Sequence, residues 1–292
     1  MQYKQIKVET IPNHQNIYLF LKSNGYSENY IKNLRKDSQN IKVNGNFVTT
    51  KHKLQQNDIL EINSNPNTST SIMQCDMPLD IVFEDDSILV VNKPSGISSM
   101  PNRSHYSHNL AGAIVCYMKQ KDSHFVLRML NRLDKDTQGL IIVAKNALIY
   151  KQLASSVSKT YHALVCGKLE TEMTIEKNIK DIINENGIIN IKRVVAEDGK
   201  PAVTYVTPIK VFDEYTLCEI KLQFGRTHQI RVHLSSEGYP LLGDYIYGKE
   251  SPLINHTALV CKQIEFVHPM TQAKITLKTD YEPDFLKFIK MA

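Results

Sequence analysis

The sequence predicts an α+β protein in two parts, a small N-terminal α/β domain and a larger strand-rich domain. Two helical patterns and a hairpin signal occupy residues 1–63, a stretch rich in Ser, Thr, Asn and Pro follows, and strand signals dominate from residue 79 onward. A chain of 292 residues is long enough for one large and one small domain. We therefore expect a small domain over 1–63, a linker over 64–78 and a second domain over 79–292.

The small domain is predicted to open with two short helices. Residues 17–21 place apolar side chains at helical spacing before Gly25, a residue that suits a helix C-terminus. Ser27 can then cap a second helix that extends to about Asp37.

This second helix is predicted to have one apolar face and one basic face. Ile31 and Leu34 share the first, and Lys32, Arg35 and Lys36 share the second. Residues 1–63 carry +4 of the formal net charge of +5. A basic excess of this size fits a solvated surface as well as it fits nucleic-acid binding.

A β-hairpin and one further strand complete the small domain. Residues 41–43 and 47–48 flank Asn44-Gly45, a pair that supplies the positive φ angles of a type I′ turn. Residues 58–62, DILEI, are predicted to form one more strand.

In the larger domain, strands outnumber helices and do not alternate with them regularly, which favours an α+β fold over a βαβ repeat. The sequence has no internal repeat, phosphate-binding glycine loop or dinucleotide fingerprint. The predicted strands cover residues 81–83, 88–91, 140–144, 162–166, 203–208 and 216–224, and the predicted helices cover about 109–119 and 147–156.

Cysteine and histidine spacing argues against a metal site. The five cysteines contain no CxxC pair, so we expect reduced thiols. No HExxH motif occurs, and His228 and His233 at i, i+5 do not share a helical face, so we expect no metal site. The N-terminus lacks the apolar core of a signal peptide, and apolar runs are too short to span a bilayer. We expect a cytoplasmic protein with no membrane association.

The segment Asn131–Leu140, NRLDKDTQGL, places Asp134 on a connection between two apolar stretches. Rigid neighbours on both sides can aim such a carboxylate. By itself, an aspartate in a loop more often caps a turn.

The ten residues resemble the catalytic signature of the RluA/RluD family of pseudouridine synthases, His-Arg-Leu-Asp, two variable residues, then Thr-Ser-Gly. Here Asn131 replaces the histidine and Gln138 the serine. Further segments resemble the family in the expected order over nearly all of residues 79–292: VNKPSGISSMP, KTYHALVCG, GKPAVTYV, GRTHQIRVHL, GYPLLGDYIYG and FVHP. The resemblance implies a mixed, mainly antiparallel sheet and an isomerase that converts uridine to pseudouridine in RNA without a cofactor. Residues 14–63 resemble the alpha-L RNA-binding module.

The resemblance assigns catalytic roles to Asp134, Tyr161 and Arg231. An aspartate with an unperturbed pKa of about 3.9 is ionised at neutral pH and can act as nucleophile or base. Three routes stay open: attack on the sugar, attack on the base, or abstraction of a ribose proton. Arg231 would pair with Asp134, and Tyr161 would offer a ring for stacking and a hydroxyl for proton transfer.

RNA contacts are expected at several basic residues. The target uridine must be flipped out of its helix, and Arg132 would either fill the gap or hold a phosphate. Thr227 is predicted to cap a helix that starts at His228, which places His228 and Arg231 on one face. The predicted RNA-binding residues are Arg132, Lys32, Arg35, Lys36 and His228.

The expected partner is RNA, with large-subunit ribosomal RNA favoured over transfer RNA, and we expect a monomer. A non-catalytic RNA-binding or ribosome-assembly factor on the same fold is the main alternative. A glycoside hydrolase fits less well because it needs a spaced second carboxylate, and Asp136 lies only two residues from Asp134.

Overall fold

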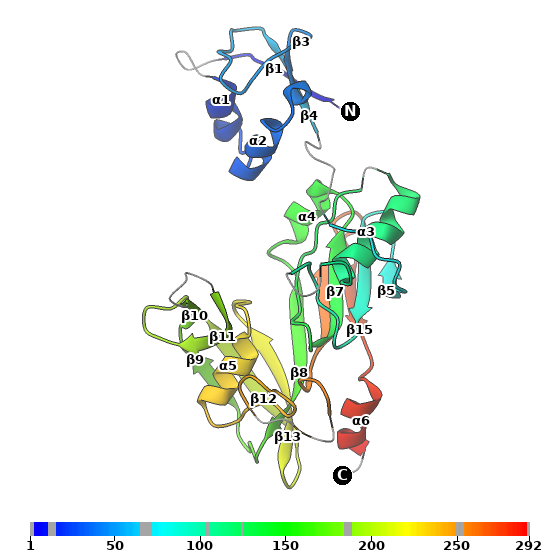
Figure 1. The fold of residues 1–292 in the computed structure, drawn as a ribbon, viewed down its shortest axis with the longest axis vertical. Coiled ribbons are helices and arrows are strands. Elements are labelled where there is room, and N and C mark those ends of the chain that lie inside the picture. The colour runs from blue at the N-terminus through cyan, green and yellow to red at the C-terminus, as the bar shows by residue number, and fades with distance from the viewer. Residues whose placement is uncertain are drawn as a thin grey trace. The chain divides into compact units, whose positions relative to one another are not determined.

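The computed structural model describes residues 3–10, 16–64, 72–102, 106–123, 125–183, 189–248, 251 and 254–290. The chain divides into two compact units, Met1–Ser71 and Ile72–Ala292, and the division falls within the predicted linker (Figure 1). The end of that linker, from Ile72 onward, belongs to the second unit, where Cys75 N donates a hydrogen bond of 3.3 Å to Gly112 O.

The first unit is an antiparallel sheet in the order β1-β4-β2-β3 together with two helices. Its elements are β1 (Tyr3–Lys7), α1 (Ile17–Ser23), α2 (Glu28–Leu34), the 3-10 helix η1 (Ser38–Asn40), β2 (Ile41–Val43), β3 (Asn46–Phe47) and β4 (Ile59–Asn63). The expectation that two helices open the chain is wrong, since β1 precedes them and pairs with β4. β1 escapes prediction because no side chain in it is fully buried and its pattern is only weakly periodic.

Local sequence accounts for the predicted parts of this unit. Ser27 caps α2 as expected, although the helix ends at Leu34 rather than near Asp37. Asn44 and Gly45 have φ angles of 51° and 82°, which confirms the left-handed turn of the hairpin.

The second unit is built on a nine-stranded mixed sheet. The strands lie in the order β5 (Asp80–Glu84), β6 (Ile88–Lys93), β7 (Gln138–Ala144), β14 (Leu259–Val267), β8 (Ser158–Cys166), β13 (Tyr215–Leu222), β12 (Val203–Val211) and β9 (Met173–Glu176), with β15 (Lys274–Lys278) paired to β14. A separate hairpin joins β10 (Ile179–Ile183) to β11 (Ile189–Val195). Within the described residues β7–β14 is the one parallel pair, which confirms the prediction of a mixed, mainly antiparallel sheet.

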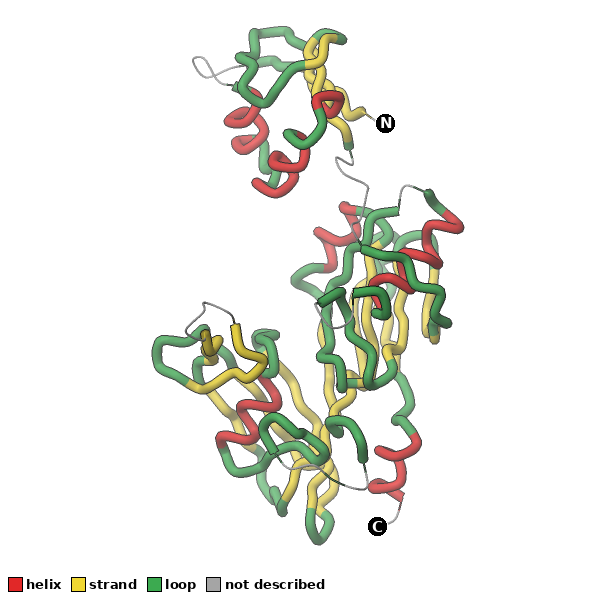
Figure 2. Tube along the Cα trace, in the orientation of Figure 1, coloured by secondary structure: helices red, strands yellow, loops and turns green. Residues whose placement is uncertain are grey.

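In the described part of this unit, four helices accompany the sheet: α3 (Leu110–Lys121), α4 (Ala147–Leu153), α5 (Gln229–Ser236) and α6 (Pro283–Lys290). α4 packs on β7, and α5 packs on β11 and β12 (Figure 2). Of the helices in the described ranges, none combines the length and apolar character needed to cross a bilayer.

β7 lies in the interior of the sheet, and all seven of its residues are buried. Its neighbour β14 approaches so closely that a Cβ on Gly139 would lie 2.5 Å from Cys261 N, and Gly139 has a φ of 124° that side-chain-bearing residues avoid. The glycine of the Asp134 motif is therefore required by strand packing.

Candidate active site

Asp134 lies in a tight turn directly before β7. The turn is closed by a hydrogen bond of 3.2 Å from Thr137 N to Asp134 O. The preceding residue is fixed by Ser99, whose hydroxyl donates to Leu133 O at 2.5 Å and accepts from Leu133 N at 3.1 Å. Hydrogen bonds to the main chain on both sides of Asp134 thus hold its backbone.

A buried lysine supports the same turn from the other side. Lys93 is 0% exposed, and its Nζ donates to the carbonyl oxygens of Pro94, Ile97 and Lys135 at 2.8, 2.7 and 2.9 Å. Burial lowers the pKa of Lys93 to about 7, although nearby carboxylates, Asp136 foremost, act in the opposite direction. The three carbonyl acceptors match the three protons of an ammonium group.

Arg231, on α5, lies between two aspartates and is only 3% exposed. Its Nε and Nη2 donate to Asp244 Oδ2 and Oδ1 at 2.7 and 2.8 Å, and its Nη1 donates to Asp134 Oδ2 at 3.3 Å. Burial would lower the pKa of Arg231, but the hydrogen bonds and charge of Asp244, reinforced by Asp134, raise it above its ordinary value. The guanidinium is therefore a fixed positive charge beside Asp134.

Asp244 is the partner that sequence reasoning missed. It is 0% exposed, and Oδ1 also accepts from the N–H groups of Ile246 and Tyr247 at 3.0 and 3.1 Å. Burial would raise the pKa of Asp244, but hydrogen bonds from Arg231 and these amides lower it. The available signal was an acidic residue inside the otherwise apolar and aromatic segment GYPLLGDYIYG.

The start of α5 differs from the prediction. Thr227 was expected to cap a helix beginning at His228, but the helix begins at Gln229 and His228 is its N-cap residue without a side-chain cap bond. His228 has a φ of 58°, in the left-handed region that His occupies more readily than most residues. The spacing of apolar and polar residues that predicts a helix does not reveal this left-handed backbone conformation.

His228 nevertheless faces Asp134, with Nε2 lying 3.7 Å from Asp134 Oδ2. Its Nδ1 lies 3.0 Å from Tyr247 Oη, and that hydroxyl accepts from Arg193 N at 2.6 Å. The Tyr247 proton is then available to Nδ1, which leaves Nε2 as the N–H that faces the carboxylate. Burial lowers the pKa of His228 despite the opposing charge of Asp134, so the imidazole is neutral near pH 7.

A cavity of about 570 Å³ opens over these groups. Its volume is in the range of small-ligand sites. Asp134 keeps 27% of its side-chain surface exposed, and Arg132 is exposed at the same opening. The side chains that line the cavity include Asn102, Arg132, Asp134, His228, Arg231 and Tyr245.

Tyr161, on β8, is 7% exposed and is not among the residues lining this cavity. Burial raises the pKa of Tyr161 well above its ordinary value, and Cys261 and Asp134 act in the same direction. The residue therefore carries a neutral hydroxyl within electrostatic range of Asp134.

The basic residues predicted in the first unit are exposed. Lys32 lies on α2, Arg35 is the C-cap residue, and Lys36 follows it. Arg35 Nε donates to Thr50 Oγ1 at 2.9 Å, and its guanidinium lies 4.9 Å from the ring centre of Tyr18.

Both departures from the family signature make internal hydrogen bonds. Asn131 Nδ2 donates to Leu140 O at 2.9 Å, and Asn131 Oδ1 accepts from Ile142 N at 3.0 Å. Gln138 bonds to the C-terminal segment in a similar two-point manner.

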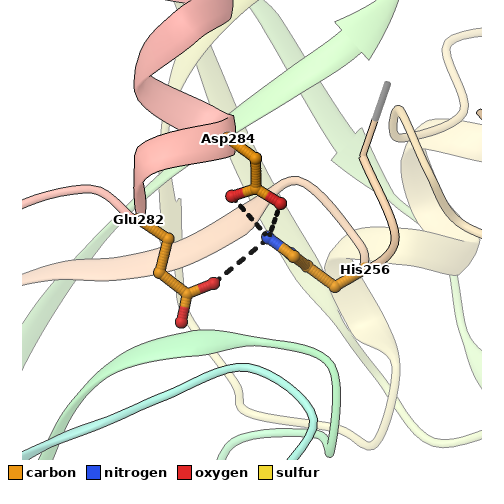
Figure 3. A group of neighbouring side chains, drawn as sticks. All are labelled: His256, Glu282 and Asp284. Carbon is orange, nitrogen blue, oxygen red and sulfur yellow. Dashed lines mark hydrogen bonds and ion pairs between the residues drawn. The ribbon is translucent and has the colours of Figure 1, made fainter. Parts of the chain in front are cut away.

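A second cluster combines an imidazole with two carboxylates, donor types that bind divalent cations. The donor atoms of His256, Glu282 and Asp284 lie within 4.8 Å of one another (Figure 3). His256 Nε2 is 3.1 Å from Glu282 Oε2 and 3.1 Å from Asp284 Oδ2. At these distances the single atom Nε2 is within hydrogen-bond range of both carboxylates, and Nδ1 lies 3.0 Å from Thr257 O.

Comparison with known proteins shows which family the chain resembles. The family described as RNA pseudouridylate synthase matches residues 87–236. An uncharacterized RNA pseudouridine synthase of Bacillus subtilis, YjbO, is 32% identical and the match covers 91% of this chain and 95% of the relative. A ribosomal large subunit pseudouridine synthase D of Pseudomonas aeruginosa is 34% identical, with 74% and 72% covered. The solved structure of human RNA pseudouridylate synthase domain containing 1 shares the fold, with a TM-score of 0.55 at 23% identity over 70% of this chain and 84% of that one.

This chain is therefore an RNA-modifying isomerase. It belongs to the RNA pseudouridylate synthase family, as the sequence resemblance implied.

Proposed function

We propose that this protein isomerises uridine in structured large-subunit ribosomal RNA and that Asp134 carries the reaction. The observation that carries the proposal is the partly exposed Asp134 carboxylate, held in a 570 Å³ cavity by a guanidinium that Asp244 fixes in turn. The choice of RNA rests on relatives named as ribosomal large subunit pseudouridine synthases D.

The reaction needs no oxidant, water or external group. The bond from ribose C1′ to uracil N1 breaks, the base turns, and C1′ bonds to C5; N1 gains a proton and C5 loses one. In each of the three routes open to Asp134 the carboxylate must be ionised and aimed at the nucleoside. Arg231 favours the second condition because it places beside the carboxylate a buried positive charge whose direction is set by a two-point bond to Asp244.

Substrate handling is assigned to residues of both units. Arg132, at the cavity opening, would fill the space of the flipped uridine or hold its phosphate. Tyr161 would serve the reaction through its neutral hydroxyl, and His228 through its Nε2–H. Lys32, Arg35 and Lys36 would contact the RNA backbone, and their exposure supports this role.

Release of tritium from RNA labelled at uridine C5 tests the proposal. Ribosomal RNA fragments and transfer RNA would be compared with the wild type, Asp134→Asn and a matched surface control, Asp213→Asn, whose side chain is fully exposed. We expect release from ribosomal RNA by the wild type and the control, and none by Asp134→Asn. Activity in Asp134→Asn would refute the catalytic assignment. Tritium release from transfer RNA alone would identify transfer RNA as the substrate in place of ribosomal RNA. Tight RNA binding by the wild type without tritium release would favour a non-catalytic RNA-binding factor.

A further inference from the structure

The C-terminal segment Asp280–Asp284 bonds to residue 138, which directly follows the Asp134 turn. Gln138 is 4% exposed, and its side-chain amide pairs with the backbone of this segment. Nε2 donates to Asp280 O at 3.0 Å, and Oε1 accepts from Glu282 N at 3.0 Å. A side chain of this length, carrying both a donor and an acceptor, is needed to make both bonds.

The same segment also bonds to the loop that follows β6. Glu282 accepts hydrogen bonds from Ser95 through both carboxylate oxygens, 2.8 Å from Ser95 N and 2.6 Å from Ser95 Oγ. That loop is tied to the Asp134 turn by Lys93, whose Nζ bonds to Lys135 O as well as to carbonyls of the loop. Two chains of hydrogen bonds thus run from Glu282 to the two sides of the turn.

The segment has a firm anchorage of its own. His256 Nε2 lies between the carboxylates of Glu282 and Asp284 (Figure 3), and His256 is 4% exposed. Beyond them, Phe285 and Phe288 of α6 are buried in an apolar cluster that is distinct from the main core. The segment can therefore hold the turn in place instead of moving with it.

We propose that residues 280–284 form a clasp that positions the Asp134 turn for reaction, with Gln138 as the positioning residue. The inference rests on the proposed role of Asp134. Gln138 acts through the backbone of the turn and does not touch the substrate. A misplacement of about 1 Å in a reacting group can lower a rate on the order of 100-fold.

The test uses the full-length protein with Gln138→Met, which keeps length but removes both hydrogen bonds. Gln152→Met, at an exposed position of α4, is the matched control. We expect Gln138→Met to lower kcat about 10-fold or more while the Kd for RNA stays unchanged, and to speed hydrogen exchange at the Thr137 amide, which closes the turn. Gln152→Met should leave kcat, the Kd for RNA and the exchange of the Thr137 amide unchanged.

A second variant separates positioning from general stability. In Gln138→Glu, an ionised carboxylate repels Asp280 O, whereas a protonated one donates to it as the amide does. The kcat of Gln138→Glu relative to wild type should therefore recover as pH falls, and that of Gln138→Met should not. Wild-type kcat and Thr137 exchange in Gln138→Met would overturn the clasp. An inactive wild type would refute the proposed function instead, and the exchange measurement would still decide on the clasp.

Discussion

Replacing Asp244 with asparagine isolates the charge that fixes Arg231. The asparagine Oδ1 can keep the bonds to Arg231 Nη2 and to the amides of Ile246 and Tyr247. The atom that replaces Oδ2 is an NH₂ group, which faces Arg231 Nε donor to donor. The variant therefore loses one charge-assisted hydrogen bond and the countercharge of a buried guanidinium.

The expected loss of stability follows from these contacts. A hydrogen bond to a charged group contributes about 1.5–3 kcal/mol, and breaking a buried ion pair costs about 3–5 kcal/mol. Asp134 remains as a second countercharge at 3.3 Å, so we expect Asp244→Asn to lower the free energy of unfolding by about 2–3 kcal/mol. Because Arg231 then loses one of the three hydrogen bonds that direct it toward Asp134, kcat should fall about 10- to 100-fold with RNA affinity little changed.

Urea denaturation would measure the stability, and tritium release at saturating RNA would measure kcat. Asp213→Asn provides the control, since solvent screens its exposed ion pair with Lys168, which should contribute little to stability. If Asp244→Asn unfolds at the wild-type urea concentration and retains wild-type kcat, Arg231 does not depend on Asp244 and the reasoning is refuted.

Three further outcomes are expected. Gly139→Ala should lower the free energy of unfolding, measured in urea, by about 3 kcal/mol or more, because the new Cβ would lie 2.5 Å from Cys261 N. Gly225→Ala, with open space around the Cβ, should be nearly neutral, and equal losses in the two variants would contradict the role of strand packing. The pKa of Lys93 is about 7 in the folded protein and 10.5 in the unfolded chain, so between these pH values the unfolded chain binds more protons. The free energy of unfolding of the wild type, relative to that of Lys93→Met, should therefore rise with pH by up to about 1.4 kcal/mol per pH unit, and a difference independent of pH would show that the amine stays charged. Lys32→Glu combined with Lys36→Glu should weaken RNA binding in filter-binding assays and make the RNA affinity less dependent on salt, while kcat at saturating RNA stays unchanged. An unaltered salt dependence would show that these lysines do not contact the RNA.

The sequence by itself determined the local structure. Alternation and apolar runs located strands such as β6, β7 and β13, and Asn44-Gly45 located the hairpin, because these signals depend on residues that are neighbours in the chain. The resemblance supplied Asp134 and Arg231 as a pair, and the structure places their side chains 3.3 Å apart.

Only the tertiary structure decided which distant groups support that pair. Asp244 reaches Arg231 because of the chain path after α5, and the left-handed backbone of His228 replaces the cap expected at Thr227. Gln138, which sequence comparison treated as a mere departure, bonds to residues more than 140 positions away. Such contacts depend on strand order and burial, which no local periodicity encodes; the sequence could locate the reactive carboxylate but not the groups that hold it.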